Sequence, residues 1–316
     1  MQEPSHPQAS MTRAEFLRLA AGAVAGLALG GRSAALLAAP LASMQTRGIP
    51  STGEALPVVG LGTYRGFDAL PGSVEYGRLP GVLQALFAAG GSVIDSSPMY
   101  GRAESATGEL LAATGGRRKA FVATKVWTRG RAEGLRQMED SLRLLRADPL
   151  DLMQVHNLVD WRTHLAVLRE WKAAGRIRYF GITHYSASAY DELAAVMRAE
   201  RFDFLQINYS LDEREAERYI LPLAAERGMA VLINRPFGGG GLLRRLGDRP
   251  LPPWAAEIGA GSWAQLLLKF VLSHPAVTCA IPGTGRPEHM VDNAGAGIGR
   301  IPDAAFWRRH PELFNL

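Results

Sequence analysis

Short apolar runs rich in β-branched and aromatic residues alternate with longer segments of helical periodicity along most of the chain. Most of the runs are apolar at successive positions, which is typical of strands covered on both faces of a parallel sheet. The runs that we expect to form strands are residues 57–64, 92–97, 120–126, 150–156, 178–185, 203–210, 230–237 and 277–283.

The segments between these runs predict helices. Residues 79–90 place apolar side chains at helical spacing and end on Gly90, and residues 134–146 and 164–175 follow the same pattern. Eight strands joined by helical crossovers favour an α/β fold, a (β/α)8 TIM barrel. A doubly wound open sheet is the alternative, but no Gly-x-Gly-x-x-Gly turn links the first strand to a helix.

Residues 1–45 differ from the rest, and we interpret them as a signal or targeting segment before a barrel domain of residues 46–316. A charged stretch passes into a mildly apolar run too short for a confident membrane span, followed by small residues suited to cleavage near Ala42. The segment resembles a twin-arginine export signal, although Ala14 stands where the second arginine belongs. An ordinary secretory signal and an uncleaved apolar helix are the alternatives.

Export would make the export machinery a partner and the location periplasmic or exported. The protein stays cytoplasmic if the signal is not functional.

The composition, with 47% hydrophobic and 21% charged residues, is that of an ordinary globular protein. The net charge of +5 is modest and scattered along the chain, which argues against a nucleic-acid partner. The single cysteine, Cys279, excludes an internal disulfide and a cysteine-rich metal site. We therefore expect no bound metal, and we expect a monomer.

Polar residues fall at the C-terminal ends of three successive strands, where a barrel carries its chemistry. They are Asp95 with Tyr100 just beyond it, Lys125 and His156. Taken singly, the aspartate could cap a helix, the tyrosine could pack on the rim and the histidine could be a hydrogen-bonded core residue. The lysine is harder to dismiss, because the chain has 31 arginines and only 4 lysines.

Together the four side chains predict one site. Asp95 would neutralise and orient the Lys125 ammonium, and that cation would lower the pKa of Tyr100 from about 10 toward physiological values. Tyr100 could then protonate a carbonyl oxygen, while His156 donates a hydrogen bond to the same oxygen. The carbonyl carbon would still need a hydride. A Schiff-base aldolase built on Lys125 is a remote alternative.

Seven motifs in order along residues 55–300 resemble the aldo-keto reductase family. They are GLGT at 60–63, IDSSPMYG at 94–101, TKVW at 124–127, DLMQVH at 151–156, GITHYS at 181–186, QINYS at 206–210 and IPGTGRPEHMVDN at 281–293. The resemblance implies reduction of an aldehyde or ketone to the alcohol with NADPH, NADH being the alternative. It makes Asp95, Tyr100, Lys125 and His156 the catalytic residues and Tyr100 the proton donor.

The resemblance also implies where the cofactor lies. The nicotinamide would be flanked by Gly62 and Thr63, stacked on by Tyr209 and held at its carboxamide by Thr183, His184 and Gln206. The pyrophosphate would follow Arg235, Phe237 and Gly238, and the adenosine end would contact Thr284, Arg286, Asp292 and Asn293. Tyr209 as a core aromatic and residues 238–241 as a flexible tip are the alternatives.

An apolar, aromatic substrate pocket is expected at the barrel mouth. Its walls would be Tyr64, Met99 and Trp127, with Phe237 or Trp254 as further candidates and residues 238–254 as a lid. The substrate would be a small carbonyl compound. A catalytically weak, nucleotide-bound sensor or accessory subunit on the same fold is the competing function.

Overall fold

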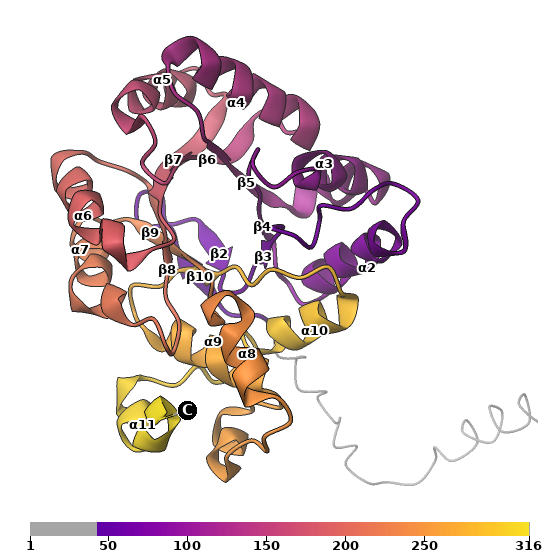
Figure 1. Ribbon diagram of the computed structural model, residues 1–316, viewed down its shortest axis with the longest axis vertical. Helices are drawn as coiled ribbons and strands as arrows, with labels where there is room; N and C mark the ends of the chain where they lie inside the picture. Colours follow the sequence, from indigo (N-terminus) through magenta and orange to yellow (C-terminus); the bar gives the residue numbers. More distant parts are fainter. Residues whose placement is uncertain (1–42, 316) are drawn as a thin grey trace, which may run out of the picture. The chain divides into compact units, whose positions relative to one another are not determined.

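The computed structural model describes residues 43–315 and shows a closed barrel of parallel strands surrounded by helices (Figure 1). Every neighbouring pair of strands in the sheet is parallel, and bridges between Val59 and Ala280 and between Gly62 and Gly283 join its two edges. The predicted (β/α)8 barrel is confirmed. The barrel strands are β3 (Leu61–Gly62), β4 (Val93–Asp95), β5 (Phe121–Val126), β6 (Leu150–His156), β7 (Ile177–Thr183), β8 (Phe204–Asn208), β9 (Ala230–Asn234) and β10 (Cys279–Ala280).

Helices follow the strands and form the outer layer. Several begin at a side chain that accepts a hydrogen bond from the first turn, as Ser73 does from the backbone N–H of Tyr76 and Ser262 from that of Gln265. The helices are α2 (Val74–Ala88), α3 (Ala103–Ala113), α4 (Arg131–Leu145), α5 (Trp161–Ala173), α6 (Tyr190–Ala199), α7 (Ile220–Glu226), α8 (Gly241–Leu246), α9 (Trp263–Ser273), α10 (Pro287–Gly295) and α11 (Ala304–Arg308).

Two expectations about these elements need correction. The predicted strand 57–64 is broken, because Pro57 ends the short strand β2 (Ala55–Pro57) and only Leu61–Gly62 forms β3. Residues 238–254, expected to be a loop that acts as a lid, contain α8, and a second short helical segment begins at Pro253, with the ring of Trp254 packed against Trp307 near the C-terminus. Within residues 43–315, no helix combines the length and apolar character needed to span a membrane.

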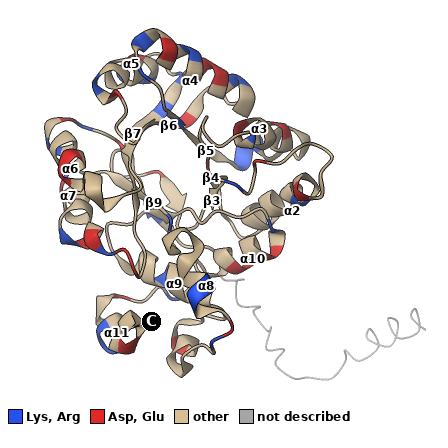
Figure 2. Ribbon diagram, viewed as in Figure 1, with Lys and Arg blue, Asp and Glu red and all other residues tan. Residues whose placement is uncertain are grey.

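Side chains alternate between the barrel interior and the space beneath the helices. Phe121, Leu152, Tyr179 and Phe204 belong to the interior cluster, whereas Val122 and the other outward residues belong to the larger cluster under the helices. The strands are therefore apolar on both faces, as their continuous hydrophobic runs predict. Charged residues are spread over many helices, as Figure 2 shows, in agreement with the scattered charge of the sequence.

A β-hairpin of β1 (Thr46–Gly48) and β2 packs against the N-terminal end of the barrel. Ile49 and Leu56 are buried in the interior cluster, and Arg47 donates to the carbonyl of Leu272 at 2.5 Å near the end of α9. Gln45 donates from its backbone to the carbonyl of Gly297 at 2.8 Å. The packed domain thus includes residues 44 and 45, which the sequence interpretation assigned to the targeting segment; residues 1–42 lie outside the described part.

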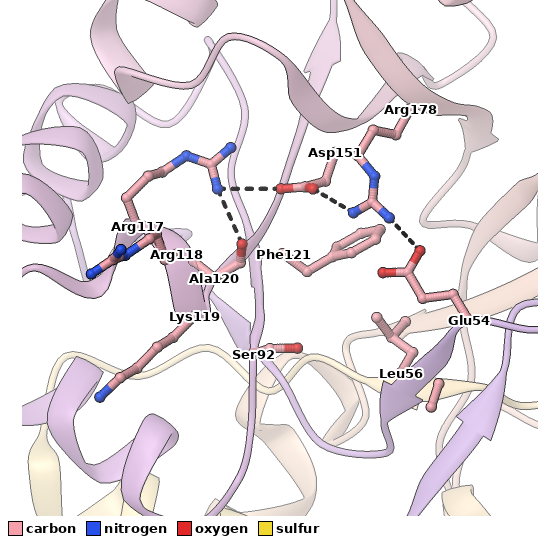
Figure 3. A pocket seen from close by; sticks show the side chains of 11 residues that line it. Glu54, Leu56, Ser92, Arg117, Arg118, Lys119, Ala120, Phe121, Asp151 and Arg178 are labelled. Atoms are coloured by element: carbon pink, nitrogen blue, oxygen red, sulfur yellow. Dashed lines mark hydrogen bonds and ion pairs between the residues drawn. The ribbon is translucent and has the colours of Figure 1, made fainter. Parts of the chain in front are cut away.

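An ion-pair cluster ties this hairpin to the strands across a cleft of about 270 Å³ (Figure 3). Arg178 of β7 pairs with Asp151 at 2.8 Å and with Glu54 of the hairpin, and Arg117 approaches Asp151 at 3.5 Å. The cleft lies at the N-terminal ends of the strands, the rim that serves stability in such barrels. We therefore assign this cluster to the scaffold.

Lys269 of α9 is fully buried and has no acidic partner within residues 43–315. Its ammonium donates to the carbonyls of Ile298 at 3.0 Å and Arg300 at 2.8 Å, which fixes the segment after α10. Burial lowers the pKa of this amine to about 8, from an ordinary value of 10.5.

This lysine should make stability rise with pH on the alkaline side. Because its pKa is lower in the folded state, the unfolded chain binds the proton more tightly, and the resulting cost disappears as the pH rises from about 8 toward 10.5. We expect the free energy of unfolding of the wild type, measured by urea denaturation, to rise relative to that of Lys269→Met as the pH increases over this interval. A constant difference between the two proteins would contradict the prediction.

Candidate active site

The structure brings the four predicted side chains together at one end of the barrel. Asp95 ends β4, Lys125 lies one residue from the end of β5, and His156 ends β6. In the parallel register Asp95 pairs with Ala123, so Lys125 lies two residues further along β5 than the level of Asp95. Lys125 in turn pairs with Gln154, so His156 lies two residues further along β6 than the level of Lys125. Each points into the barrel because it is an even number of residues from an interior apolar side chain of its own strand.

A buried ion pair forms the base of the site. The Nζ of Lys125 lies 2.6 Å from Oδ2 of Asp95 and 2.7 Å from the carbonyl oxygen of Ser96. The lysine side chain is fully buried, and the same Nζ lies 5.1 Å from the centre of the Tyr100 ring. Burial lowers the pKa of Lys125, but Asp95 and Tyr100 raise it by more, so the amine remains protonated.

The second oxygen of Asp95 is also fully engaged. Its Oδ1 accepts from Nε2 of Gln206 at 2.8 Å and from Nε2 of Gln154 at 3.2 Å. The oxygen of the Gln206 side chain in turn accepts from the Thr183 hydroxyl at 3.3 Å. Gln206 and Thr183, expected at the nicotinamide carboxamide, thus lie in the polar layer that holds the aspartate, together with Gln154, which the sequence analysis missed.

Tyr100 has a raised pKa, and the expectation that Lys125 lowers it toward physiological values is wrong. Burial raises the pKa of the phenol, and the opposing effect of the Lys125 charge is smaller. The Asp95 carboxylate, 2.6 Å from the ammonium, adds to the rise and offsets part of the lowering by Lys125. Tyr100 therefore carries its proton, as an acid must before it acts.

His156 is held as a neutral imidazole. Burial lowers its pKa to about 3, with further lowering from the charges of Lys125 and His184. Its Nδ1 lies 3.1 Å from the hydroxyl of Ser97, which accepts weakly from the backbone N–H of Met99 at 3.5 Å. A Ser97 hydroxyl that donates to Nδ1 leaves the ring proton on Nε2, where it can be donated. Ser97 was not predicted, since its partner is distant in the sequence.

Aromatic and apolar side chains surround this polar centre. Tyr64, Met99 and Trp127 are exposed at the barrel mouth, with ring centres 5.0 Å apart for Tyr64 and Tyr100 and 6.2 Å apart for Trp127 and His156. The candidate Trp254 does not belong to this wall. Its ring stacks on His310 at 4.3 Å, in a cluster with the C-terminal helix.

The prediction that Tyr209 stacks on the nicotinamide is wrong. Its ring is 1% exposed and packs against Phe270 and His274 of the helical layer, and its hydroxyl donates to Glu217 at 2.6 Å. The reason is the alternation of the strand: Gln206 points into the barrel, so the residue three positions later points outward.

The segment after β9 carries glycines beside arginines. Gly238, Gly239 and Gly240 all have positive φ, between 57° and 88°, which favours glycine at each position. The guanidinium groups of Arg235, Arg244 and Arg245 lie 3.3–3.5 Å from the positions that Cβ atoms would take at Gly239, Gly240 and Gly241. Phe237 is buried at the start of this segment.

These arginines are partly neutralised by a neighbouring loop. Arg235 pairs with Glu213 at 3.3 Å and Arg245 pairs with Asp212 at 2.7 Å. Three arginines against two acidic side chains leave the turn cationic, and such a turn suits an elongated anion.

The remaining cofactor candidates lie around the barrel rim. Thr63 donates to the carbonyl of Asp95 and to the Ser96 hydroxyl, both at 3.0 Å, and so fixes the turn before the ion pair. His184 follows β7 and accepts from the backbone N–H of Ser186 at 3.2 Å. Gly62 lies on β3 with its backbone beside Gly283, which leaves no room for a side chain.

Residues 284–293 form the turn and helix α10 on the same rim. The hydroxyl of Thr284 accepts from the backbone N–H of Arg286 at 3.1 Å, and the Arg286 side chain is exposed. Asp292 accepts from Ser262 and Gln265, both at 2.8 Å, while Asn293 is buried beside it. The carboxylate of Asp292 is therefore already bound by α9.

The described residues contain no cluster of histidine, cysteine and acidic side chains suited to a metal ion. What the site offers is a protonated phenol beside a neutral imidazole whose Nε2 can donate, above a buried ammonium. These groups can converge on one oxygen that gains negative charge, such as that of a carbonyl undergoing reduction.

Comparisons with known proteins point in the same direction. The sequence model of the Aldo/keto reductase family matches residues 58–307. Methylglyoxal reductase YeaE of Escherichia coli (strain K12) is 33% identical over 260 residues, which cover 79% of this chain and 89% of that protein.

Solved structures agree with the sequence matches. The crystal structure of an aldo/keto reductase from Klebsiella pneumoniae in complex with NADP and acetate is similar with a TM-score of 0.71 and 27% identity, over 83% of this chain and 93% of the other. A second structure from Klebsiella pneumoniae, an aldo-keto reductase in complex with NADPH, has a TM-score of 0.71 and 26% identity, over 86% of this chain and 95% of the other.

The ion pair should show strong thermodynamic coupling. Asp95→Asn leaves a buried ammonium without its counterion, and Lys125→Met leaves a buried carboxylate, so we expect each change to lower the free energy of unfolding by roughly 3–5 kcal/mol. The double variant removes both charges and should cost clearly less than the sum, measured by urea denaturation. Additive losses would show that the two groups do not depend on each other.

Proposed function

The chain belongs to the aldo/keto reductase family of oxidoreductases, and from that premise we propose that it reduces an aldehyde or ketone to the alcohol with NADPH as cofactor and Tyr100 as proton donor. The observation that carries the proposal is the meeting of Tyr100, the Lys125–Asp95 ion pair and His156 at one barrel mouth. The NADP and NADPH of the two Klebsiella pneumoniae structures support the choice of cofactor, with NADH as the alternative.

The residues present fit such a cofactor. The glycine turn with Arg235, Arg244 and Arg245 alongside offers positive charge and close backbone approach, which a pyrophosphate requires. Thr284 and Arg286 stand at a neighbouring turn for the adenosine end, and the exposed guanidinium of Arg286 could pair with a 2′-phosphate. When bound, NADPH supplies the hydride.

The protein's own part is to position the carbonyl oxygen and to give it a proton. Nε2–H of His156 donates a hydrogen bond to that oxygen and holds it toward the phenol. As negative charge grows on the oxygen, the Tyr100 hydroxyl transfers its proton, and the nearby Lys125 ammonium stabilises the phenolate that forms. Asp95 keeps that ammonium in place and prevents an isolated buried charge.

The mouth favours an apolar carbonyl compound. Tyr64, Met99 and Trp127 surround the polar centre with aromatic and thioether surface. The relative that acts on methylglyoxal supports a small aldehyde as the first compound to test. Oxidation of NADPH followed at steady state, with methylglyoxal and a series of aromatic and aliphatic aldehydes, tests the proposal. Tight nucleotide binding without turnover on any of them would favour a sensor or accessory subunit instead.

Removing the proton donor should abolish reduction without weakening the nucleotide complex. For Tyr100→Phe we expect kcat to fall by about 10²–10⁴-fold, because the phenolic proton is lost, and NADPH binding to stay nearly unchanged. Steady-state rates and a fluorescence titration give the two quantities. Tyr219→Phe, which removes a surface hydroxyl bonded to Asp191, is the matched control and should keep wild-type rates. A parallel loss of NADPH affinity in Tyr100→Phe would argue for a structural role.

The pH dependence of reduction should lack a histidine ionisation near neutrality. His156 has a pKa of about 3, so it is neutral throughout the range from pH 5 to 8, and its ability to donate from Nε2 does not change there. We expect the plot of kcat/KM for the aldehyde against pH to show no inflection near pH 6.5 in the wild type. His156→Gln should therefore leave the shape of that plot unchanged around pH 6.5. A decline above pH 6.5 that this substitution removes would mean that the charged imidazole is the active form.

A further inference from the structure

Asn234, the last residue of β9, carries an unpartnered acceptor inside the candidate site. Its Nδ2 donates to the carbonyl of His184 at 3.2 Å and to Oε1 of Gln206 at 3.5 Å. Its Oδ1 is buried and has no hydrogen-bond partner within the described residues.

The orientation of this amide is fixed by the ion pair beneath it. Asp95 accepts from Nε2 of Gln206, so the oxygen of Gln206 must face the other way, toward Thr183 and Asn234. That oxygen and the His184 carbonyl are both acceptors, and Asn234 can bond to them only through the N–H groups of its Nδ2. Flipping the Asn234 amide would set oxygen against oxygen. The free Oδ1 is therefore a consequence of the network.

A buried acceptor without a donor is unfavourable, and in native proteins it calls for an explanation. Other described side chains also have such atoms, but the Oδ1 of Asn234 is connected through Gln206 to the carboxylate that holds Lys125. What it lacks is an N–H or O–H donor.

Gln206, expected to bind the nicotinamide carboxamide, has both ends of its amide engaged by protein groups. The unpartnered acceptor beside it is Oδ1 of Asn234. We propose that Oδ1 of Asn234 accepts a hydrogen bond from the carboxamide NH₂ of the bound nicotinamide and thereby sets the orientation of the ring. This inference rests on the proposed function. The carboxamide is the hydrogen-bond donor of that ring system, which matches the missing partner.

The test compares NADP⁺ with its 3-acetylpyridine analogue, in which a methyl group replaces the carboxamide nitrogen. Dissociation constants come from quenching of tryptophan fluorescence in the full-length protein. We expect the wild type to bind NADP⁺ about tenfold more tightly than the analogue, and Asn234→Leu, of similar size and without an acceptor, to bind the two nearly equally. Asn234→Asp keeps an acceptor and should continue to discriminate.

Asn208 provides the matched control, because it pairs with Asn234 in the strand register and its amide is already used by Tyr190 and Glu213. Asn208→Leu should retain the wild-type preference. Binding of 2′,5′-ADP, which lacks the nicotinamide, should be equal in all variants and reports that each is folded.

The outcomes separate this inference from the proposed function. Equal binding of the two nucleotides by the wild type, or undiminished discrimination by Asn234→Leu, overturns the role of Asn234 while NADPH-dependent reduction stands. Absence of binding to any of NADP⁺, NADPH and 2′,5′-ADP overturns the proposed cofactor and, with it, the inference.

Discussion

The buried pair of Lys125 and Asp95 is the interaction on which the site depends. An ammonium with no exposed surface is tolerable only if acceptors surround it, and here a carboxylate at 2.6 Å and a carbonyl at 2.7 Å do so. The carboxylate must also be satisfied, and Gln154 and Gln206 complete it. The need to bury one charge therefore orders a polar layer across β4, β5, β6 and β8, and the orientation of each amide in that layer follows from the charge at its centre.

The same pair explains the protonation states above it. Burial raises the pKa of Tyr100 by more than the Lys125 ammonium lowers it, because the Asp95 carboxylate offsets part of the effect of that ammonium. Burial is also the main reason why His156 stays neutral, and the positive charge of Lys125 lowers its pKa further. The site thus holds two neutral hydrogen-bond donors above one compensated cation. Such a site can stabilise developing negative charge on a substrate oxygen without binding a hydroxide or carboxylate strongly beforehand.

The sequence was sufficient for the barrel and for the four central side chains, because both depend on local patterns. Residues 150–156 form β6 as predicted, since every position of this run is buried and its apolar residues lie on both faces of the strand. The first strand was predicted too long, because Pro57 and the flanking hairpin interrupt it. Ser97, Gln154 and Asn234 were missed, as their partners are set by the register of other strands. Tyr209 was misassigned because a motif match carries no information about which face of the strand a residue occupies.

The two fully buried lysines show how the choice of cation relates to position. A compact ammonium can be satisfied by two or three acceptors, whereas a guanidinium with five donors needs a larger polar shell, which this chain provides mainly at the surface, where most of its ion pairs use arginine. Lys125 faces a carboxylate and its pKa rises; Lys269 donates to two backbone carbonyls and its pKa falls. The dipole of a carbonyl compensates only part of the hydration that an ammonium loses on burial. The full negative charge of a carboxylate can stabilise the ammonium by more than the lost hydration did. The presence of Asp95 thus accounts for the opposite pKa shifts of the two buried lysines.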